Sequence, residues 1–161
     1  MIYVGICDDD IEMVAKIERL VEDYMKWKHI LTNIEIFNVG SDVIDYINKG
    51  ERYDIIFLDI EMQGINGIDV AREIRKVDKN FILIYVSGHT QYAIEAYEVQ
   101  PFRFLQKPFS LDKFYQYYDA AIQEIRQNDV CFRYSANKQN FRIMIKDIIY
   151  FESRNRIIIY F

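Results

Sequence analysis

Residues 53–67, YDIIFLDIEMQGING, constrain the fold of this chain more than any other stretch. They hold an apolar run, 55–58 continuing past Asp59 to Ile60, that is rich in β-branched and aromatic residues. Such a run is typical of a strand buried on both faces, and therefore of a parallel sheet. A carboxylate is costly inside such a strand, so we expect Asp59 at its carboxyl end, beside a glycine-containing loop. Taken alone, Asp59 is equally compatible with a simple strand end or a helix cap.

Strands and helices alternate over the first 127 residues. Apolar strands are predicted at 2–7, 33–38, 55–60, 81–86 and 102–105. Helices are predicted at 11–27, 40–47, 66–77, 89–97 and 110–127. The first of these shows apolar residues at helical spacing with charges on its other faces. Regular alternation of this kind predicts an α/β fold, a doubly wound five-stranded parallel sheet with right-handed crossovers.

From residue 128 the pattern changes to strands alone. They are predicted at 132–135, 141–145, 148–151 and 157–161, with polar turns between them. We therefore expect two domains, 1–127 and a partial all-β segment at 128–161. Strands without a covering helix predict pairing with another chain or with a domain that continues.

Charge is distributed unevenly between these two parts. Six basic and two acidic residues from Val130 onward give this part +4, which leaves −9 on the preceding part of a chain whose total is −5. A basic β segment is compatible with contact to phosphate backbones, although such a segment is more often an ordinary solvated surface.

Several broad classes of protein are excluded by composition. No apolar run is long enough for a membrane span, and the N-terminus MIYVGICDDD lacks the pattern of a signal peptide, so we expect a cytoplasmic protein without a membrane partner. Cys7 and Cys131 form neither a disulfide framework nor a paired metal motif. We expect both to be ordinary thiols and Cys7 to be buried.

Polar residues follow four of the predicted parallel strands. Asp8 and Asp9 come after the first, Asp59 after the third, Ser87 after the fourth and Lys107 after the fifth. Because the carboxyl ends of parallel strands meet along one rim, these side chains can share a pocket. Three clustered carboxylates repel one another unless a cation intervenes, and an oxygen-only cluster suits Mg²⁺ better than zinc.

Such a pocket could carry out phosphoryl chemistry. Beside a bound metal, the Asp59 carboxylate can act as a nucleophile toward phosphorus. The Lys107 ammonium and the Ser87 hydroxyl can each bind a phosphoryl oxygen, so no general base is required. Each residue also has a purely structural explanation, as a cap, a turn residue or a surface charge. Their joint placement at matching strand ends favours a shared site.

Four motifs resemble the receiver domain of bacterial two-component response regulators over about residues 1–125. They are CDDD at 7–10, FLDIEMQGINGID at 57–69, VSGH at 86–89 and FLQKPF at 104–109. The resemblance implies a flavodoxin-like fold and a phosphorelay in which a sensor histidine kinase phosphorylates Asp59. It also implies Mg²⁺ as the cofactor.

The resemblance also implies roles for individual residues. Asp8, Asp9, Asp59 and the backbone carbonyl of Glu61 would bind Mg²⁺. Ser87 and Lys107 would contact the phosphoryl group, and the Lys107-Pro108 bond would be cis.

A switch is implied as well. Ser87 would move toward the phosphoryl group, and Phe104 would turn into the vacated space and change the face formed by the fourth helix and fifth strand. Phe104 stands where tyrosine is common in the family, so a state held by a tyrosine hydroxyl is not available here. Phe104 is equally compatible with a core aromatic in both states.

The segment HTQYAIEAYEVQPFRFLQKPF at 89–109 is similar to receivers that precede LytTR DNA-binding domains, the LytR/AgrA type. The tail, with IIYFES at 148–153, resembles the opening strands of such a domain. The resemblance implies transcription regulation by a full-length parent, DNA contact only through a more complete LytTR domain, and a homodimer as a further partner.

Two other functions are compatible with the same residues. A Mg²⁺-dependent phosphohydrolase working through an aspartyl-phosphate intermediate needs a positioned acid or base, for which Glu61 and His89 are the nearest candidates. A module that only binds partners does not need an intact acidic pocket. The motifs favour a phosphorylation-dependent switch that is not an enzyme.

Overall fold

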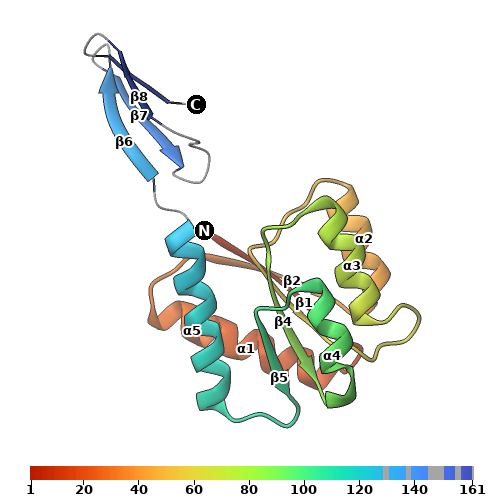
Figure 1. Ribbon diagram of the computed structural model, residues 1–161. Coiled ribbons are helices and arrows are strands. Elements are labelled where there is room, and N and C mark those ends of the chain that lie inside the picture. The colour runs from red at the N-terminus through yellow and green to blue at the C-terminus, as the bar shows by residue number, and fades with distance from the viewer. Residues whose placement is uncertain (129–130, 137–138, 145–150, 155–156, 161) are drawn as a thin grey trace. The chain divides into compact units, whose positions relative to one another are not determined.

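The computed structural model describes residues 1–128, 131–136, 139–144, 151–154 and 157–160 of the chain (Figure 1). The chain divides into two compact units, Met1–Tyr118 and Asp119–Phe161, and the division falls inside helix α5, Leu111–Asn128. The domain boundary expected between residues 127 and 128 stays a prediction.

The first unit is built on a five-stranded sheet whose strand order is β2-β1-β3-β4-β5. The strands are β1 (Ile2–Cys7), β2 (Thr32–Phe37), β3 (Ile55–Leu58), β4 (Ile82–Ser87) and β5 (Arg103–Gln106). Every neighbouring pair is parallel. All four residues of β3 are buried, as its apolar run predicted. The doubly wound parallel sheet is therefore confirmed.

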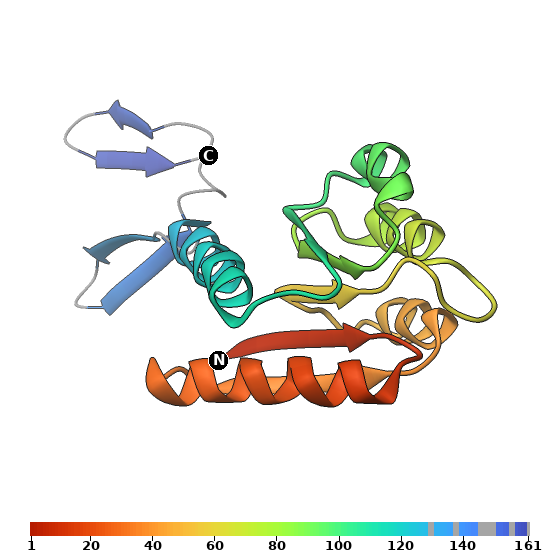
Figure 2. The ribbon, with the colours of Figure 1, turned by 90° about the horizontal axis from the view of Figure 1, so that it is seen from below.

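Helices cover both faces of this sheet. They are α1 (Ile11–Trp27), α2 (Gly40–Asn48), α3 (Gly67–Val77), the short α4 (Ala93–Ala96) and α5. Figures 1 and 2 show α1 and the start of α5 on one side, and α2, α3 and α4 on the other. Among the helices of the described residues, none has the length and apolar character that crossing a membrane requires.

Side-chain caps explain where three of the helices begin. The Asp10 carboxylate accepts hydrogen bonds from the backbone N–H groups of two residues in the first turn of α1. Asn66 caps α3 in the same way, and the Ser110 hydroxyl accepts from the backbone N–H of Lys113 at 3.2 Å. These bonds satisfy N–H groups that the first turn of a helix leaves without partners. One of the three aspartates at 8–10 is thus a cap, as expected.

The single helix predicted at 89–97 is wrong. The segment forms a 3₁₀ turn at Thr90–Tyr92, the four residues of α4, and a second 3₁₀ turn at Tyr97–Val99. Ile94 is 89% exposed, whereas Ala96 is buried. A 3₁₀ turn has three residues per turn rather than 3.6, so an α-helical period assigns the wrong residues to the inner face.

The two faces of the sheet pack against different clusters of side chains. The first, which we call the α1-face cluster, comprises Tyr24, Phe57, Phe114 and Tyr118, with neighbouring ring centroids 5.0–5.7 Å apart. The second, which we call the α3-face cluster, contains Leu58, Val70 and Tyr85 among its buried members. Phe57 and Leu58 belong to opposite clusters because successive strand residues face opposite ways.

The second unit contains two antiparallel strand pairs after the end of α5. These strands are β6 (Cys131–Ala136) with β7 (Gln139–Met144), and β8 (Phe151–Arg154) with β9 (Ile157–Tyr160). The change from alternating elements to strands alone is as expected. The strand predicted at 148–151 lies outside the described residues except for Phe151, where β8 begins.

Candidate functional site

Two aspartates reach one rim of the sheet from neighbouring strands. Asp8 directly follows β1 and Asp59 directly follows β3, and the two strands pair so that Cys7 lies opposite Leu58. The backbone N–H of Asp59 donates to the Cys7 carbonyl at 2.9 Å, which extends this pairing by one residue. Asp8 is 1% exposed and Asp59 is 7% exposed. The carboxylates therefore lie side by side in a largely dehydrated place.

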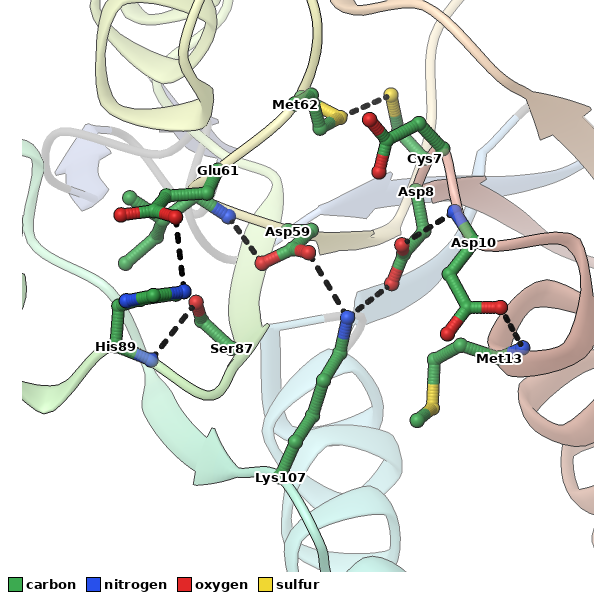
Figure 3. A network of polar contacts seen from close by, with 12 residues as sticks. Cys7, Asp8, Asp10, Met13, Asp59, Glu61, Met62, Ser87, His89 and Lys107 are labelled. Atoms are coloured by element: carbon green, nitrogen blue, oxygen red, sulfur yellow. Dashed lines mark hydrogen bonds and ion pairs between the residues drawn. The ribbon is translucent and has the colours of Figure 1, made fainter.

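Lys107 joins these two carboxylates. Its Nζ lies 2.7 Å from Oδ2 of Asp8 and 2.8 Å from Oδ2 of Asp59 (Figure 3). The lysine follows β5, and its backbone N–H donates to the Ser87 carbonyl at 2.9 Å, so β4 and β5 together position it. The Lys107-Pro108 bond is cis, as expected. Three residues from β1, β3 and β5 thus meet in one pocket.

The charges in this pocket depend on one another. Burial raises the pKa of Asp8, and the hydrogen bond from Lys107 only partly opposes this effect. Burial alone would lower the pKa of Lys107, but its hydrogen bonds to Asp59 and Asp8 outweigh that effect and the pKa is raised. The lysine is therefore firmly cationic, and its single charge faces two carboxylates. The pocket still attracts cations.

Asp9 completes an acidic cluster with Asp8 and Asp59. One carboxylate oxygen from each residue lies within 4.8 Å of the others. Asp9 is exposed, and its Oδ2 accepts from the backbone N–H of Gln63 at 3.2 Å. A cluster of carboxylate oxygens with one side open to water has the donor chemistry that Mg²⁺ prefers. The residues present therefore fit a hard divalent cation.

Ser87, Glu61 and His89 lie along the neighbouring part of the rim (Figure 3). Ser87 is fully buried, and its hydroxyl oxygen accepts from the backbone N–H of His89 at 3.3 Å. The His89 Nε2 lies 2.8 Å from the Glu61 carboxylate. The Ser87 oxygen acts here as an acceptor, and its hydroxyl hydrogen can be donated to a group in the pocket.

Phe104 lies on β5, beside the α3-face cluster. It is half-buried and contacts the α3-face cluster, where its ring centroid lies 6.3 Å from that of Tyr85. This position is compatible with either expectation for Phe104, a moving ring or a fixed core residue.

Two residues that shape the site, Gly67 and Tyr85, were not among the predicted site residues. A Cβ atom added to Gly67 would lie 1.9 Å from the Asp59 carbonyl oxygen, so no other residue fits there without a shift of the backbone. The Tyr85 hydroxyl donates to the Gly67 carbonyl at 3.3 Å. The available signals were a glycine in the first turn of a helix and a tyrosine within the aliphatic strand ILIYVS.

Comparison with known families identifies the first unit. The model of the response regulator receiver domain matches residues 4–119. The chain belongs to the response regulator receiver family. The match includes residues of all five strands of the parallel sheet and every residue of the pocket.

Curated relatives of this receiver carry the names LytT and LytR. It is 36% identical over 107 residues to the sensory transduction protein LytT of Oceanobacillus iheyensis. This match covers 63% of the chain and 44% of that relative. It is 28% identical over 119 residues to LytT of Bacillus subtilis, which covers 72% of the chain and 46% of that protein. The chain thus spans less than half the length of these relatives.

Solved structures show the same fold. The response regulatory domain of protein mrkE from Klebsiella pneumoniae has a TM-score of 0.69 and 21% identity, covering 78% of this chain and 98% of that domain. A CheY-like receiver domain protein from Methanospirillum hungatei has a TM-score of 0.67 and 15% identity. The match covers 79% of this chain and 98% of that protein's chain. At these identities the likeness shows the receiver fold alone, and it confirms the flavodoxin-like architecture.

Proposed function

We propose that a sensor histidine kinase transfers a phosphoryl group to Asp59 and that this transfer switches an output or dimerisation surface near Phe104. The observation that supports this proposal is the meeting of three carboxylates and Lys107 at the ends of β1, β3 and β5. The family of the chain and its LytT and LytR relatives point to the same role.

In the transfer, a carboxylate oxygen of Asp59 attacks the phosphorus of the kinase phosphohistidine. An O–P bond forms as the P–N bond breaks, and the histidine nitrogen keeps the electron pair. The Lys107 ammonium lies 2.8 Å from the attacking carboxylate and can bind a phosphoryl oxygen. The Ser87 hydroxyl can donate to another.

Asp8, Asp9, Asp59 and the Glu61 carbonyl are the groups that would hold Mg²⁺. The ion supplies positive charge that neutralises phosphoryl oxygens in a pocket of negative residues. The buried position of Asp8 and Asp59 strengthens this attraction, because water competes less there. Asp10 is not part of the set, since its carboxylate caps α1.

A switch fits the chain better than an enzyme. The comparisons favour a receiver over the Mg²⁺-dependent phosphohydrolase, which would require the Glu61–His89 pair to act as acid and base. Transcription regulation in the cytoplasm, a homodimer, and DNA contact through a more complete LytTR domain belong to this proposal. They rest on the LytT and LytR relatives and on the strands that follow residue 130.

The deciding experiment is the intact mass of the protein after incubation with Mg²⁺ and acetyl phosphate. We expect one phosphoryl adduct that disappears in Asp59→Ala and after chelation of the metal. Asp45→Ala, which removes an exposed aspartate of α2, should label as the wild type does. Lys107→Ala should take up the group but respond less in dimerisation. An adduct that persists in Asp59→Ala, or donor consumption over many turnovers, would contradict the proposed phosphoryl switch at Asp59.

A further inference from the structure

Tyr85 is a polar residue in a fully buried strand of the sheet. It belongs to β4, all of whose six residues are buried, and its own side chain is 0% exposed. Its hydroxyl donates to the Gly67 carbonyl at 3.3 Å, a long hydrogen bond for a hydroxyl donor. Burial raises the pKa of Tyr85, so the phenol keeps its proton and acts as a donor. This bond joins the middle of β4 to the first residue of α3.

Gly67 is in turn in contact with the backbone of the candidate phosphoryl acceptor. Its missing side chain would meet the Asp59 carbonyl oxygen at 1.9 Å and the Asp59 carbonyl carbon at 2.9 Å. Its backbone N–H donates to the Ile60 carbonyl at 2.8 Å. A displacement of the backbone at Asp59 or Ile60 therefore displaces Gly67, because the contact leaves no space between them.

The ring of Tyr85 leads from this contact to Phe104. The two residues are direct partners in the pairing of β4 with β5, and their ring centroids lie 6.3 Å apart at 48°. On its other side Tyr85 is paired with Leu58, the residue before Asp59. Tyr85 thus lies between the acceptor strand and the residue whose movement the proposed switch requires.

We propose that Tyr85 is a positioning residue that couples the state of Asp59 to Phe104 through its hydrogen bond to Gly67. The proposal rests on the function proposed above and names a further residue in its output. Phosphorylation shifts the backbone after Asp59, Gly67 follows, and the Tyr85 hydroxyl moves with the carbonyl that it binds. Close packing passes this motion to the Phe104 ring. The route is separate from the Ser87 hydroxyl, which lies beside His89.

The test compares Tyr85→Phe with a matched control, Tyr118→Phe. Both variants remove one hydroxyl from a tyrosine that is 0% exposed. The Tyr85 hydroxyl is hydrogen-bonded, whereas within the described residues the Tyr118 hydroxyl has no hydrogen-bond partner. Each protein is treated with Mg²⁺ and acetyl phosphate. Phosphoryl uptake is measured by intact mass, and amide hydrogen exchange is measured over residues 102–106.

We expect all three proteins to take up one phosphoryl group. The change in exchange on phosphorylation should be at least about threefold smaller in Tyr85→Phe than in the wild type, and should be unchanged in Tyr118→Phe. Equal changes in all three proteins, with normal uptake, would overturn the coupling and leave the receiver function standing. Absence of uptake in the wild type would overturn the receiver function, and the coupling with it. An equal loss of response in both variants would identify a general effect of buried hydroxyl removal and would also overturn the coupling.

Discussion

The α1-face cluster and the α3-face cluster cover the same sheet but are held together differently. On the α1 face, rings pack on rings, as in the stacked pair of Phe57 and Phe114 with centroids 5.6 Å apart. On the α3 face, the packing of buried side chains is supplemented by hydrogen bonds from side chains to backbone carbonyls and by a close backbone contact. Tyr85 binds the Gly67 carbonyl there, and the Arg75 guanidinium donates to the carbonyl of Phe81 at 2.9 Å.

This difference separates stability from signalling. A cluster of rings stabilises the fold through buried area, which depends little on the orientation of single groups. A hydrogen bond or a close contact between specific atoms transmits displacement, because one partner cannot move without the other. We therefore expect changes on the α1 face to alter the free energy of unfolding alone, and changes on the α3 face to alter the pocket as well.

The largest effect is expected on the α1 face, from Phe114→Ala. Phe114 is 1% exposed and its ring contacts those of Phe57, Tyr118 and two further aromatic residues. Truncation should lower the free energy of unfolding by about 4 kcal/mol, from lost burial and the cavity left behind. Urea denaturation measures this loss.

Leu111→Ala is the control for Phe114→Ala, on the same helix. Leu111 is 54% exposed, so its truncation should cost less than about 1 kcal/mol. The folded fraction of Phe114→Ala should still take up a phosphoryl group at Asp59. A sharp fall in phosphoryl uptake per folded molecule of Phe114→Ala would show that the α1 face also affects the pocket, against the separation of stability from signalling.

The next effect is expected on the α3 face, from Gly67→Ala. The new Cβ would lie 1.9 Å from the Asp59 carbonyl oxygen, and relief requires movement of backbone rather than of a flexible side chain. We expect a loss of about 3 kcal/mol in the free energy of unfolding. Unlike Phe114→Ala, this variant should also lose phosphoryl uptake per folded molecule, since the displaced group is Asp59 itself.

Gly88→Ala is the matched control for that substitution. Gly88 is exposed, and a Cβ built there meets nothing within 4 Å. Its substitution should leave the free energy of unfolding within about 0.5 kcal/mol of the wild type. Equal stability of Gly67→Ala and Gly88→Ala in urea would show that the contact at Asp59 yields easily, and the proposed coupling through Gly67 would lose its basis.

The sheet and the pocket could be predicted because their signals are local. An apolar run that ends in a carboxylate, as at Asp59, places both the strand and the charge. The same pattern at Asp8 and the lysine after β5 gave the other members, since parallel strands bring their carboxyl ends to one rim. Distances along the chain do not matter to that inference.

The hydrogen bonds and the close contact on the α3 face could not be predicted because they depend on tertiary contacts. The need for glycine at position 67 arises from the Asp59 carbonyl, which approaches only after β3 and α3 have packed. The partner of Tyr85 likewise depends on that packing. The exposure of Ile94 depends on 3₁₀ turns whose sequence still shows a helical apolar pattern. Helix propensity depends on the local sequence alone, whereas the structure of this segment also depends on its tertiary packing.

The smallest effect is expected from Tyr118→Phe, and its sign should be opposite to that of Tyr85→Phe. The Tyr118 hydroxyl is buried and has no hydrogen-bond partner among the described residues. Its removal should raise the free energy of unfolding at neutral pH by about 1 kcal/mol, because an unpaired buried hydroxyl is costly. Removal of the Tyr85 hydroxyl should lower it by about 1 kcal/mol, because the Gly67 carbonyl loses its donor.

Alkaline pH sharpens this test. Burial raises the pKa of Tyr118 in the folded protein above its ordinary value of 10.0. The stability that depends on a protonated phenol is therefore fully present below about pH 10 and is lost as the pH rises toward the folded value. One pH unit above the ordinary value, ionisation of the unfolded chain at this residue costs the wild type about 1.4 kcal/mol, which Tyr118→Phe does not lose. The difference in free energy of unfolding between Tyr118→Phe and the wild type, measured in urea, should therefore increase by that amount between neutral pH and about pH 11. A constant advantage would mean that the phenol ionises in the folded state, and a disadvantage at neutral pH would mean that the hydroxyl is paired on the α1 face as it is on the α3 face.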